Sequence, residues 1–238
     1  MKIIQVPFSE GSMNKNKGTE LAPSVLCKGV KSPIVKISKD IDQTYKNIEL
    51  TNGDLYIGGD HSITYSTFKS FSKKYKNPGL IILDAHPDAE VYTQTHTHED
   101  FVRKLVDEKY LKKQNLIYIG LRNISKNEKQ FLKQVTWFKS ETKLEKIKET
   151  IIKLSNKCDA IYLSVDTDVI DSKYYKSTGY PEKQGLTPTK FFKILNLIKN
   201  LNIKRIDLVE YNPLLDKKKK DLELVKKILK ELNSYKSS

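Results

Sequence analysis

The sequence predicts an α/β fold with a mostly parallel, doubly wound sheet of about eight strands. Short apolar runs alternate with helical patterns along the 238 residues, which is the βαβ rhythm of a parallel sheet. Most of these runs are apolar almost throughout, as expected when helices cover both faces of the sheet. No repeat, linker or change of composition divides the chain, so we expect a single domain over residues 1–238.

The expected strands are short runs dominated by Ile, Leu, Val and Tyr. In chain order they are Lys2–Val6, Ile34–Ile37, Leu55–Ile57, Leu80–Leu83, Leu116–Ile119, Val135–Trp137, Ala160–Val165 and Arg205–Val209. The expected helices are longer stretches with a helical pattern of apolar residues. In chain order they are Glu20–Lys28, Ile63–Tyr75, Glu99–Tyr110, Glu128–Lys133, Thr142–Asn156, Pro188–Asn200 and Leu222–Tyr235.

Composition narrows the class of protein. The chain has no apolar run long enough to span a membrane, and its opening residues lack the layout of a signal peptide. The two cysteines, Cys27 and Cys158, fit neither a disulfide framework nor a cysteine metal site. We therefore expect a cytoplasmic protein without a membrane partner.

The formal net charge of +14 raises the question of nucleic-acid binding. The lysines are spread along the chain, and a dense run such as Lys217–Lys220 falls in an expected loop before the last helix. No nucleic-acid-binding motif accompanies them. The charge is therefore interpreted as solvated surface, and nucleic acid is not expected as the main partner.

Four of the expected strands are each followed at once by acidic residues or histidine. These side chains are His61, Asp84, His86, Asp88, Asp166, Asp168 and Glu210. Open α/β sheets place their active sites at the carboxyl ends of their strands, so we expect these side chains to converge in one crevice.

Each cluster alone also has a plain structural explanation. Gly58-Gly59 would permit a tight turn after a strand, and Asp60 or Ser62 would cap the helix that begins near Ile63. Single Asp-x-His triplets also occur by chance or in surface networks. Three clusters at strand ends, with all four histidines of the chain between His61 and His98, favour a set of metal ligands.

The spacing of the clusters suits a pair of divalent cations. If strand geometry continues past the edge of the sheet, positions 84, 86 and 88 point to one side, and positions 166 and 168 repeat this spacing. With His61 this makes four carboxylates and two imidazoles. Two divalent cations would cancel the mutual repulsion of the four carboxylates. Oxygen-rich ligation suits Mn²⁺ better than structural Zn²⁺. Asp84 and Asp168 could bridge ions about 3.5–4 Å apart, and a shared water would supply hydroxide for hydrolysis.

Taken in order, Gly-Gly-Asp-His-Ser, Asp-Ala-His-x-Asp and Ser-x-Asp-x-Asp-x-x-Asp resemble the three signatures of the ureohydrolase superfamily. This family contains arginase, agmatinase and formimidoylglutamase. The resemblance covers nearly the whole chain and implies an arginase-like, three-layer α/β/α fold. It also implies two Mn²⁺ ions, attack of a bridging hydroxide on a guanidinium carbon, and release of urea. Family members commonly form trimers or hexamers, so a homo-oligomer is expected.

The resemblance implies a ligand set for each of the two ions. One ion would be held by His61, Asp84, Asp88 and Asp168. The other would be held by Asp84, His86, Asp166 and Asp168.

The resemblance also implies two catalytic residues. Glu210 matches the glutamate that pairs with the guanidinium of the substrate, a charge-assisted contact. His98 precedes a helical segment, as the family's proton-shuttling histidine does, and an imidazole suits protonation of a leaving amine. His96 is the alternative for this role, and otherwise it would be a surface loop residue.

Departures from better-known members bear on the substrate. The segment from Asp88 to His98 lacks the Ser-Gly-Asn run with which arginases hold the α-carboxylate of arginine, and Ser125 replaces the aspartate that holds the α-amine. Tyr180 would project towards the mouth of the site unless it packs on its own loop. We expect Ser125 and Tyr180 to contact an agmatinase-like substrate, a guanidino compound without an amino-acid head. Arginine or another guanidino or formimino compound is the alternative.

Two functions of other kinds share parts of this pattern. A metal-dependent amide hydrolase of a related fold would use the Asp-x-His device with a single ion. A catalytically silent protein that binds metal or nucleic acid would have no need of His98 or Glu210.

The stretch between Ile37 and Leu55 is also shorter than in typical members of the family, so we expect it to lack the usual intervening helices.

Overall fold

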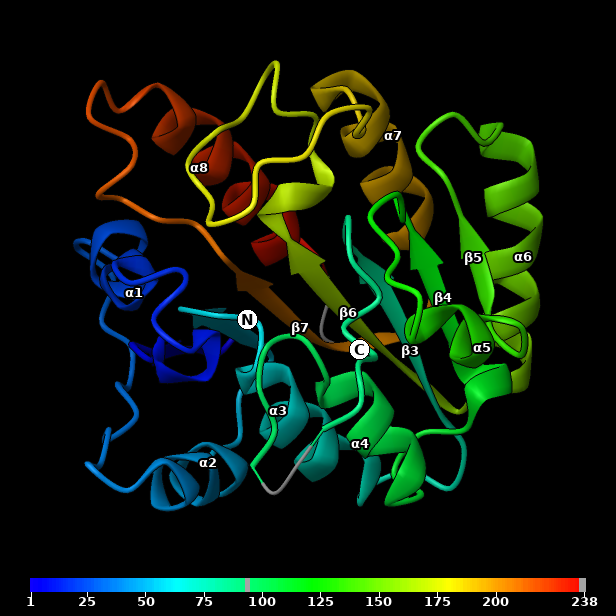
Figure 1. Ribbon diagram of the computed structural model, residues 1–238, viewed down its shortest axis with the longest axis horizontal. Helices are drawn as coiled ribbons and strands as arrows, with labels where there is room; N and C mark the ends of the chain where they lie inside the picture. Colours follow the sequence, from blue (N-terminus) through cyan, green and yellow to red (C-terminus); the bar gives the residue numbers. More distant parts are fainter. Residues whose placement is uncertain (93–94, 236–238) are drawn as a thin grey trace.

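A seven-stranded, all-parallel sheet lies at the centre of the computed structural model, which describes residues 1–92 and 95–235 (Figure 1). The strands are β1 (Ile3–Val6), β2 (Leu55–Gly58), β3 (Pro78–Leu83), β4 (Leu116–Ile119), β5 (Thr136–Phe138), β6 (Ala160–Asp166) and β7 (Ile203–Val209). Their order across the sheet is β1-β2-β7-β6-β3-β4-β5. The predicted α/β class and parallel sheet are confirmed.

One predicted strand, Ile34–Ile37, is not a strand in the structure. It contributes a single parallel bridge between Ile34 and Gln5 beside β1. Pro33 precedes it and has no N–H to donate to a ladder, and Ile34 is 64% exposed. The sheet therefore has seven strands among the described residues rather than about eight.

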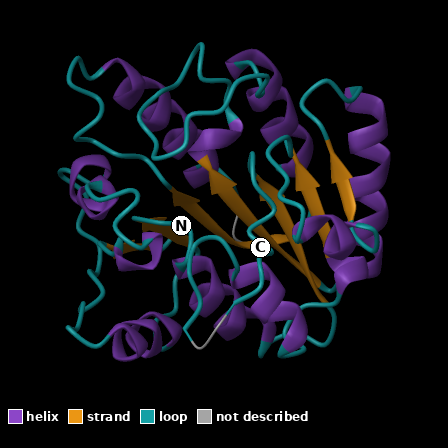
Figure 2. Ribbon diagram, in the orientation of Figure 1, coloured by secondary structure: helices purple, strands orange, loops and turns teal. Residues whose placement is uncertain are grey.

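Helices cover both faces of the sheet, which confirms the three-layer arrangement (Figure 2). Successive strand residues point to opposite faces: Leu80 and Ile82 pack in one core cluster, and Ile81 and Leu83 in another. One face is covered by α2 (Ile41–Glu49), α3 (Ile63–Ser72), α4 (Phe101–Asp107) and α5 (Glu128–Leu132). The other is covered by α1 (Ala22–Leu26), α6 (Leu144–Lys157), α7 (Pro188–Ile198) and α8 (Lys220–Asn233).

The helix α2 lies in the stretch between Ile37 and Leu55 and corrects the expectation that this stretch lacks intervening helices. Asp40 caps its first turn, because its carboxylate accepts the N–H groups of Asp42 and Gln43 at 2.9 and 3.4 Å. Tyr45 and Ile48 are buried against the first strands and α3. Within the stretch between Ile37 and Leu55 only residues 38–40 and 50–54 lie outside α2, so the helix fits.

The strands that carry the acidic clusters are neighbours in the sheet. They stand in the order β2-β7-β6-β3, so their carboxyl ends form one continuous edge. Strands β6 and β7 pair from Ile161 with Ile203 to Asp166 with Val209, which brings Asp166 and Glu210 to the same level. The fold thus assembles the predicted site from segments far apart in the sequence. Within the described residues, no helix is both long enough and apolar enough to cross a membrane.

Candidate metal centre

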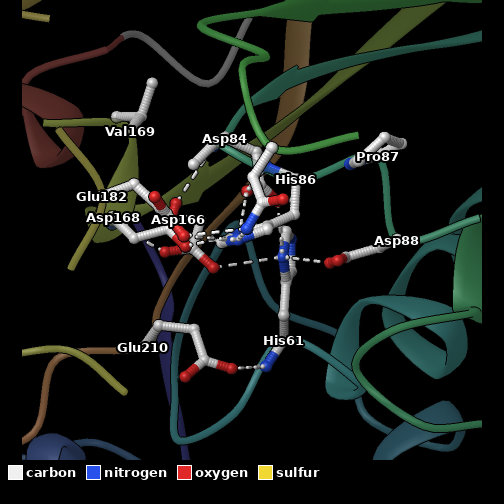
Figure 3. A network of polar contacts seen from close by, with 12 residues as sticks. His61, Asp84, His86, Pro87, Asp88, Asp166, Asp168, Val169, Glu182 and Glu210 are labelled. Atoms are coloured by element: carbon white, nitrogen blue, oxygen red, sulfur yellow. Dashed lines mark hydrogen bonds and ion pairs between the residues drawn. The ribbon is translucent and has the colours of Figure 1, made fainter. Parts of the chain in front are cut away.

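The clusters at the four strand ends meet at one point of the structure (Figure 3). Three carboxylate oxygens surround Nδ1 of the His61 ring, at 2.9 Å from Asp88, 3.1 Å from Asp84 and 3.3 Å from Asp166. All four side chains are buried. Buried carboxylates need a compensating charge, so this half of the cluster has the arrangement of a cation site.

His86 and Asp168 form the other half of the cluster. His86 Nδ1 lies 2.9 Å from Asp168 Oδ2 and 3.6 Å from Asp84 Oδ1. Potential ligand atoms of His61, Asp84 and Asp88 lie within 4.8 Å of one another, as do those of Asp84, His86 and Asp168. Asp84 is therefore common to two adjoining ligand sets.

Asp166 contacts both halves of the cluster. Its Oδ2 faces His61, whereas the resemblance assigns Asp166 to the ion held by His86. Its Oδ1 accepts the N–H of Asp168 at 2.7 Å and so fixes the turn that carries this second carboxylate. Removing Asp166 would therefore disturb ligands on both sides.

The side chains present fit divalent cations. Among the described residues, His61 Nδ1 and Asp84 Oδ2 are buried without a hydrogen-bond partner. An unsatisfied buried polar atom costs about 1–3 kcal/mol, and an ion lying between these atoms would satisfy both. Four carboxylates with two imidazoles are the oxygen-rich set that suits Mn²⁺.

Burial and mutual repulsion shift the pKa values of the cluster. Burial, together with the charge of Asp84, raises the pKa of Asp88 to about 7. Burial and the charges of Asp168 and Asp84 raise the pKa of Asp166 well above its ordinary value. Burial alone would lower the pKa of His61, but the three carboxylates that face its ring raise it well above its ordinary value. The metal-free cluster thus retains protons that bound cations would replace.

The backbone is strained at two positions of the site. Asp88 has φ 48° and Glu210 has φ 66°, both in the left-handed region that residues with a side chain avoid. Each such residue costs of order 1–3 kcal/mol, and such strain clusters at functional sites. Here it lets the chain turn sharply just beyond β3 and β7 while both carboxylates stay beside His61.

A second layer of polar residues orients the His61 ring. Its Nε2 lies 2.8 Å from Ser164 Oγ, which donates to Asp207 Oδ1 at 2.6 Å. The other oxygen of Asp207 accepts from Thr64 and Tyr162 at 2.7 and 2.6 Å. A partner on the far nitrogen of an imidazole ligand fixes its tautomer and orientation. Sequence reasoning missed this layer, although Ser164 and Asp207 were visible as polar residues inside apolar strands.

A cavity of about 210 Å³ opens beside the cluster. Among the described residues that line it, seven are acidic and none is lysine or arginine. The acidic residues are Asp88, Glu90, Glu99, Glu128, Asp166, Asp168 and Glu210. The formal charge of the whole chain is +14, so the lining has the opposite sign to the molecule as a whole.

Comparison with known proteins decides the family. The model of the Arginase family matches residues 27–233. The chain belongs to the arginase family. The resemblance read from the three sequence signatures is thereby confirmed.

Relatives within the arginase family are named for different activities. Human mitochondrial guanidino acid hydrolase is 33% identical over 172 residues, which cover 67% of this chain and 48% of that protein. Arginase from Staphylococcus aureus is 30% identical over 203 residues, covering 76% of this chain and 66% of that protein. The matches thus span about half to two thirds of these curated relatives. Formimidoylglutamase from Bacillus subtilis shares the fold, with a TM-score of 0.86 at 24% identity over 97% of this chain and 84% of that chain.

Three of the four histidines of this arginase-family chain line the cavity: His61, His86 and His98. His98 Nδ1 lies 3.3 Å from Glu210 Oε1. His96 instead lies between the rings of Tyr45 and Tyr65, with ring centroids 3.8 and 4.0 Å away. The alternative view of His96 as a surface residue is wrong, because the side chain is buried.

Ser125 and Tyr180 both line the cavity, where the sequence expects substrate-binding residues. The ring of Tyr180 lies 6.0 Å from the rings of both His86 and His98 and is 36% exposed, so it stands at the mouth. The Ser125 N–H donates to Glu128 at 2.9 Å, and Ser125 Oγ accepts the Glu128 N–H at 3.3 Å. Ser125 thus also stabilises the first turn of α5.

Sequence reasoning missed several residues of the cavity and its wall. Asn123, Glu90, Glu99, Glu128 and Thr178 lie in loops or first turns without a motif to mark them. The side-chain amide of Asn16 donates to Glu210 Oε2 across 194 positions of sequence. A contact at that separation has no local pattern from which it could be predicted.

We expect the metal-free protein to lose stability as the pH rises. Burial alone would lower the pKa of His98, but its hydrogen bond to Glu210 and the negative charges nearby raise it to about 9. Asp88, with a pKa of about 7, also holds its proton more tightly in the folded chain. Stability falls with pH wherever the folded state binds more protons. The pH range over which stability is lost runs from about pH 4 to about pH 7 for Asp88 and from about pH 6.5 to about pH 9 for His98.

Thermal melts in the presence of a chelator test this expectation. The Tm should fall by about 5 °C or more between about pH 5 and about pH 8. Saturating Mn²⁺ should reduce the fall, because cations replace protons on the ligands. Asp88→Asn should flatten the lower half of the metal-free profile. A Tm that rises with pH in the chelated protein would show that the cluster does not retain protons.

Proposed function

We propose that this protein hydrolyses the C–N bond of a linear guanidino compound, depends on Mn²⁺ and releases urea. We further propose an agmatinase-like preference for a substrate whose far end is an amine. The acidic lining of the cavity is the observation that supports this preference. Outside the proposed metal ligands, the guanidinium of such a substrate would meet Glu210, and its amine would meet Glu90 and Glu128. A substrate with a carboxylate tail would bring a like charge towards Glu90 and Glu128.

We propose that the six ligands are His61, Asp84, His86, Asp88, Asp166 and Asp168, and that they hold two ions. Two Mn²⁺ ions in this position would lower the pKa of a shared water and so supply hydroxide at neutral pH. The two adjoining ligand sets that share Asp84 favour two ions over the single ion of an amide hydrolase.

Glu210 and His98 act on the substrate itself in this proposal. The carboxylate of Glu210 is buried in the cavity wall and would accept an N–H group of the planar guanidinium, a charge-assisted contact. His98, with its pKa of about 9, carries a proton at neutral pH and would donate it to the departing amine. Tyr180 and Ser125 would contact the chain between the two charged ends.

A screen for urea release with added Mn²⁺ tests the proposed reaction and substrate together. The compounds are agmatine, arginine and guanidinobutyrate, which share the guanidinium and differ in the charge at the far end. We expect agmatine to have the highest kcat/KM and guanidinobutyrate a value lower by roughly 100-fold or more, because carboxylates repel its tail.

Two controls make this screen decisive. Glu90→Gln removes one acidic group from the cavity wall without touching the ligand cluster, and it should narrow the ratio between agmatine and guanidinobutyrate. Turnover that survives thorough chelation would refute metal dependence. Faster turnover of guanidinobutyrate than of agmatine would refute the proposed preference for a cationic tail, whereas the proposed type of reaction would stand.

A further inference from the structure

The Glu210 carboxylate is held by hydrogen-bond donors from three separate segments. Its Oε1 accepts the backbone N–H of His61 at 2.7 Å and faces the ring of His98 at 3.3 Å. Its Oε2 accepts from the side-chain amide of Asn16, in the loop between β1 and α1. Glu210 and Asn16 are both buried, at 4% and 2% exposure. Asn16 is thus the donor that fixes the second oxygen.

The orientation of the Asn16 amide follows from a chain of partners that ends on the backbone. The Leu214 N–H donates to Asn212 Oδ1 at 3.1 Å, so the oxygen of Asn212 must face Leu214. Asn212 Nδ2 then faces the other way and donates to Asn16 Oδ1 at 2.8 Å and to the Lys17 carbonyl at 3.0 Å. Because the Asn16 oxygen is taken, its Nδ2 faces Glu210.

Two glycines leave the space that this pair of amides needs. A Cβ on Gly179 would lie 2.6 Å from Asn16 Cγ. A Cβ on Gly18, where φ is +115°, would lie 2.5 Å from Asn212 Oδ1. Side chains at either position would therefore displace one of the two asparagines. The amides lie in a close-fitting cradle made by three loops.

We infer that Asn212 and Asn16 form a relay of amides that positions the Glu210 carboxylate for the guanidinium of the substrate. This inference rests on the proposed function, in which Glu210 accepts that guanidinium. Asn16 is a positioning residue: it touches Glu210 on its buried side, and it is absent from the lining of the cavity.

The relay also limits how the guanidinium can bind. A carboxylate offers about four acceptor positions. His61, His98 and Asn16 occupy three of them, which leaves one. The guanidinium therefore meets an acceptor whose direction is set before the substrate arrives. The conformational entropy of Glu210 is lost when the chain folds and is not lost again when the substrate binds.

Replacing Asn16 by aspartate tests the relay with almost no change in volume. The variant loses the N–H donor and places a second carboxylate against Glu210 Oε2. We expect the KM for the urea-releasing substrate to rise roughly 10- to 100-fold at about pH 8, with kcat changed much less, because the lost hydrogen bond is to a charged group. The inhibition constant of methylguanidine, an inert probe of the guanidinium site, should rise in parallel.

Replacing Asn212 by aspartate tests the relay from a residue with no hydrogen bond to Glu210. The carboxylate introduced by Asn212→Asp keeps an acceptor for Leu214 and loses the donor to Asn16. The Asn16 amide should then reverse, so that its oxygen faces Glu210, and the KM should rise as in Asn16→Asp. The matched control is Asn196→Asp on the exposed side of α7, which should keep the wild-type KM. A drop in kcat with an unchanged KM in the two relay variants would show a merely structural role and overturn the inference.

A spectroscopic measurement separates failure of the relay from failure of the proposed function. The side-chain NH₂ signal of Asn16, assigned by its loss in Asn16→Asp, should lie downfield in ¹H–¹⁵N spectra because one proton bonds a carboxylate. Asn212→Asp should return this signal to the ordinary amide region. That result without urea release from any guanidino compound would support the relay and refute the proposed function. Urea release with wild-type KM in both relay variants, or an unmoved Asn16 signal, would refute the relay.

Discussion

Asp166→Ala is expected to abolish urea release, with a loss of at least about 10³-fold in kcat/KM. Asp166 Oδ2 faces His61 Nδ1 at 3.3 Å, and Asp166 Oδ1 accepts the Asp168 N–H at 2.7 Å. The substitution thus removes the Asp166 carboxylate and also the hydrogen bond that fixes the position of Asp168. Several kcal/mol of stabilisation of the reacting charges depends on the ions, so losing one ion is expected to cost this much. Metal analysis should show fewer Mn²⁺ ions per chain than in the wild type.

The same substitution should not lower the stability of the metal-free fold. Burial and the neighbouring charges of Asp168 and Asp84 raise the pKa of Asp166, which means that its ionised form destabilises the empty cluster. Chelated Asp166→Ala should therefore melt no lower than chelated wild type at about pH 8. A large drop in its Tm would mean that lost activity reflects unfolding.

Asp159→Ala is the matched control for this experiment. Asp159 stands beside the opposite end of β6, where it accepts the N–H groups of Lys76 and Asn77 at 2.9 and 3.1 Å. It is far from the cluster along the strand, so this variant should keep both Mn²⁺ and urea release. Equal loss of activity in Asp159→Ala would argue against a specific role for Asp166.

His98→Asn is expected to lower kcat by about 10²- to 10⁴-fold, the usual contribution of a positioned acid or base. His98 lines the cavity beside Glu210, and its pKa of about 9 keeps it protonated at neutral pH. The kcat of the wild type should fall as the pH rises through about 9, because the acid then loses its proton. This fall should be absent from the residual activity of the variant.

His96→Phe is the control that separates the two neighbouring histidines. His96 is stacked between two tyrosine rings, and burial lowers its pKa well below the ordinary value, so it is neutral. Phenylalanine keeps the stacking, and the variant should retain kcat and its pH profile. If instead His96→Phe removes the fall near pH 9 and His98→Asn does not, the proton donor is assigned to the wrong residue.

The sequence predicts those parts of the site that sit at the ends of apolar strands. His61, Asp84 and Asp166 each follow a run of buried residues, and parallel pairing brings such ends to one edge of the sheet. This inference needs only local patterns and the general geometry of parallel sheets. The convergence of the clusters could therefore be predicted without knowing which strands are neighbours.

The rest of the site depends on contacts that carry no local pattern. Asn16 reaches Glu210 across 194 positions, and the Asn212 amide that orients it bonds across 196. His96 is buried because Tyr45 and Tyr65 come from α2 and α3, and α2 itself was not expected. Side-chain packing between segments that are far apart in the sequence decides these features. Composition and spacing do not encode it in a form that can be read from one sequence.

The order of the strands in the sheet also determines when the ligand cluster can assemble during synthesis of the chain. Strand β7 is the last of the described strands to emerge, yet it lies between β2, which leads to His61, and β6, which ends in Asp166. Until β7 inserts, no strand holds His61 beside the other five residues of the cluster, which lie at or just beyond the ends of the neighbouring strands β3 and β6. Such non-local pairing is slow to form and leaves open edges meanwhile. A ribosome-bound chain that lacks β7 should therefore capture no metal pair, and uptake of the two proposed ions would mark the completion of folding.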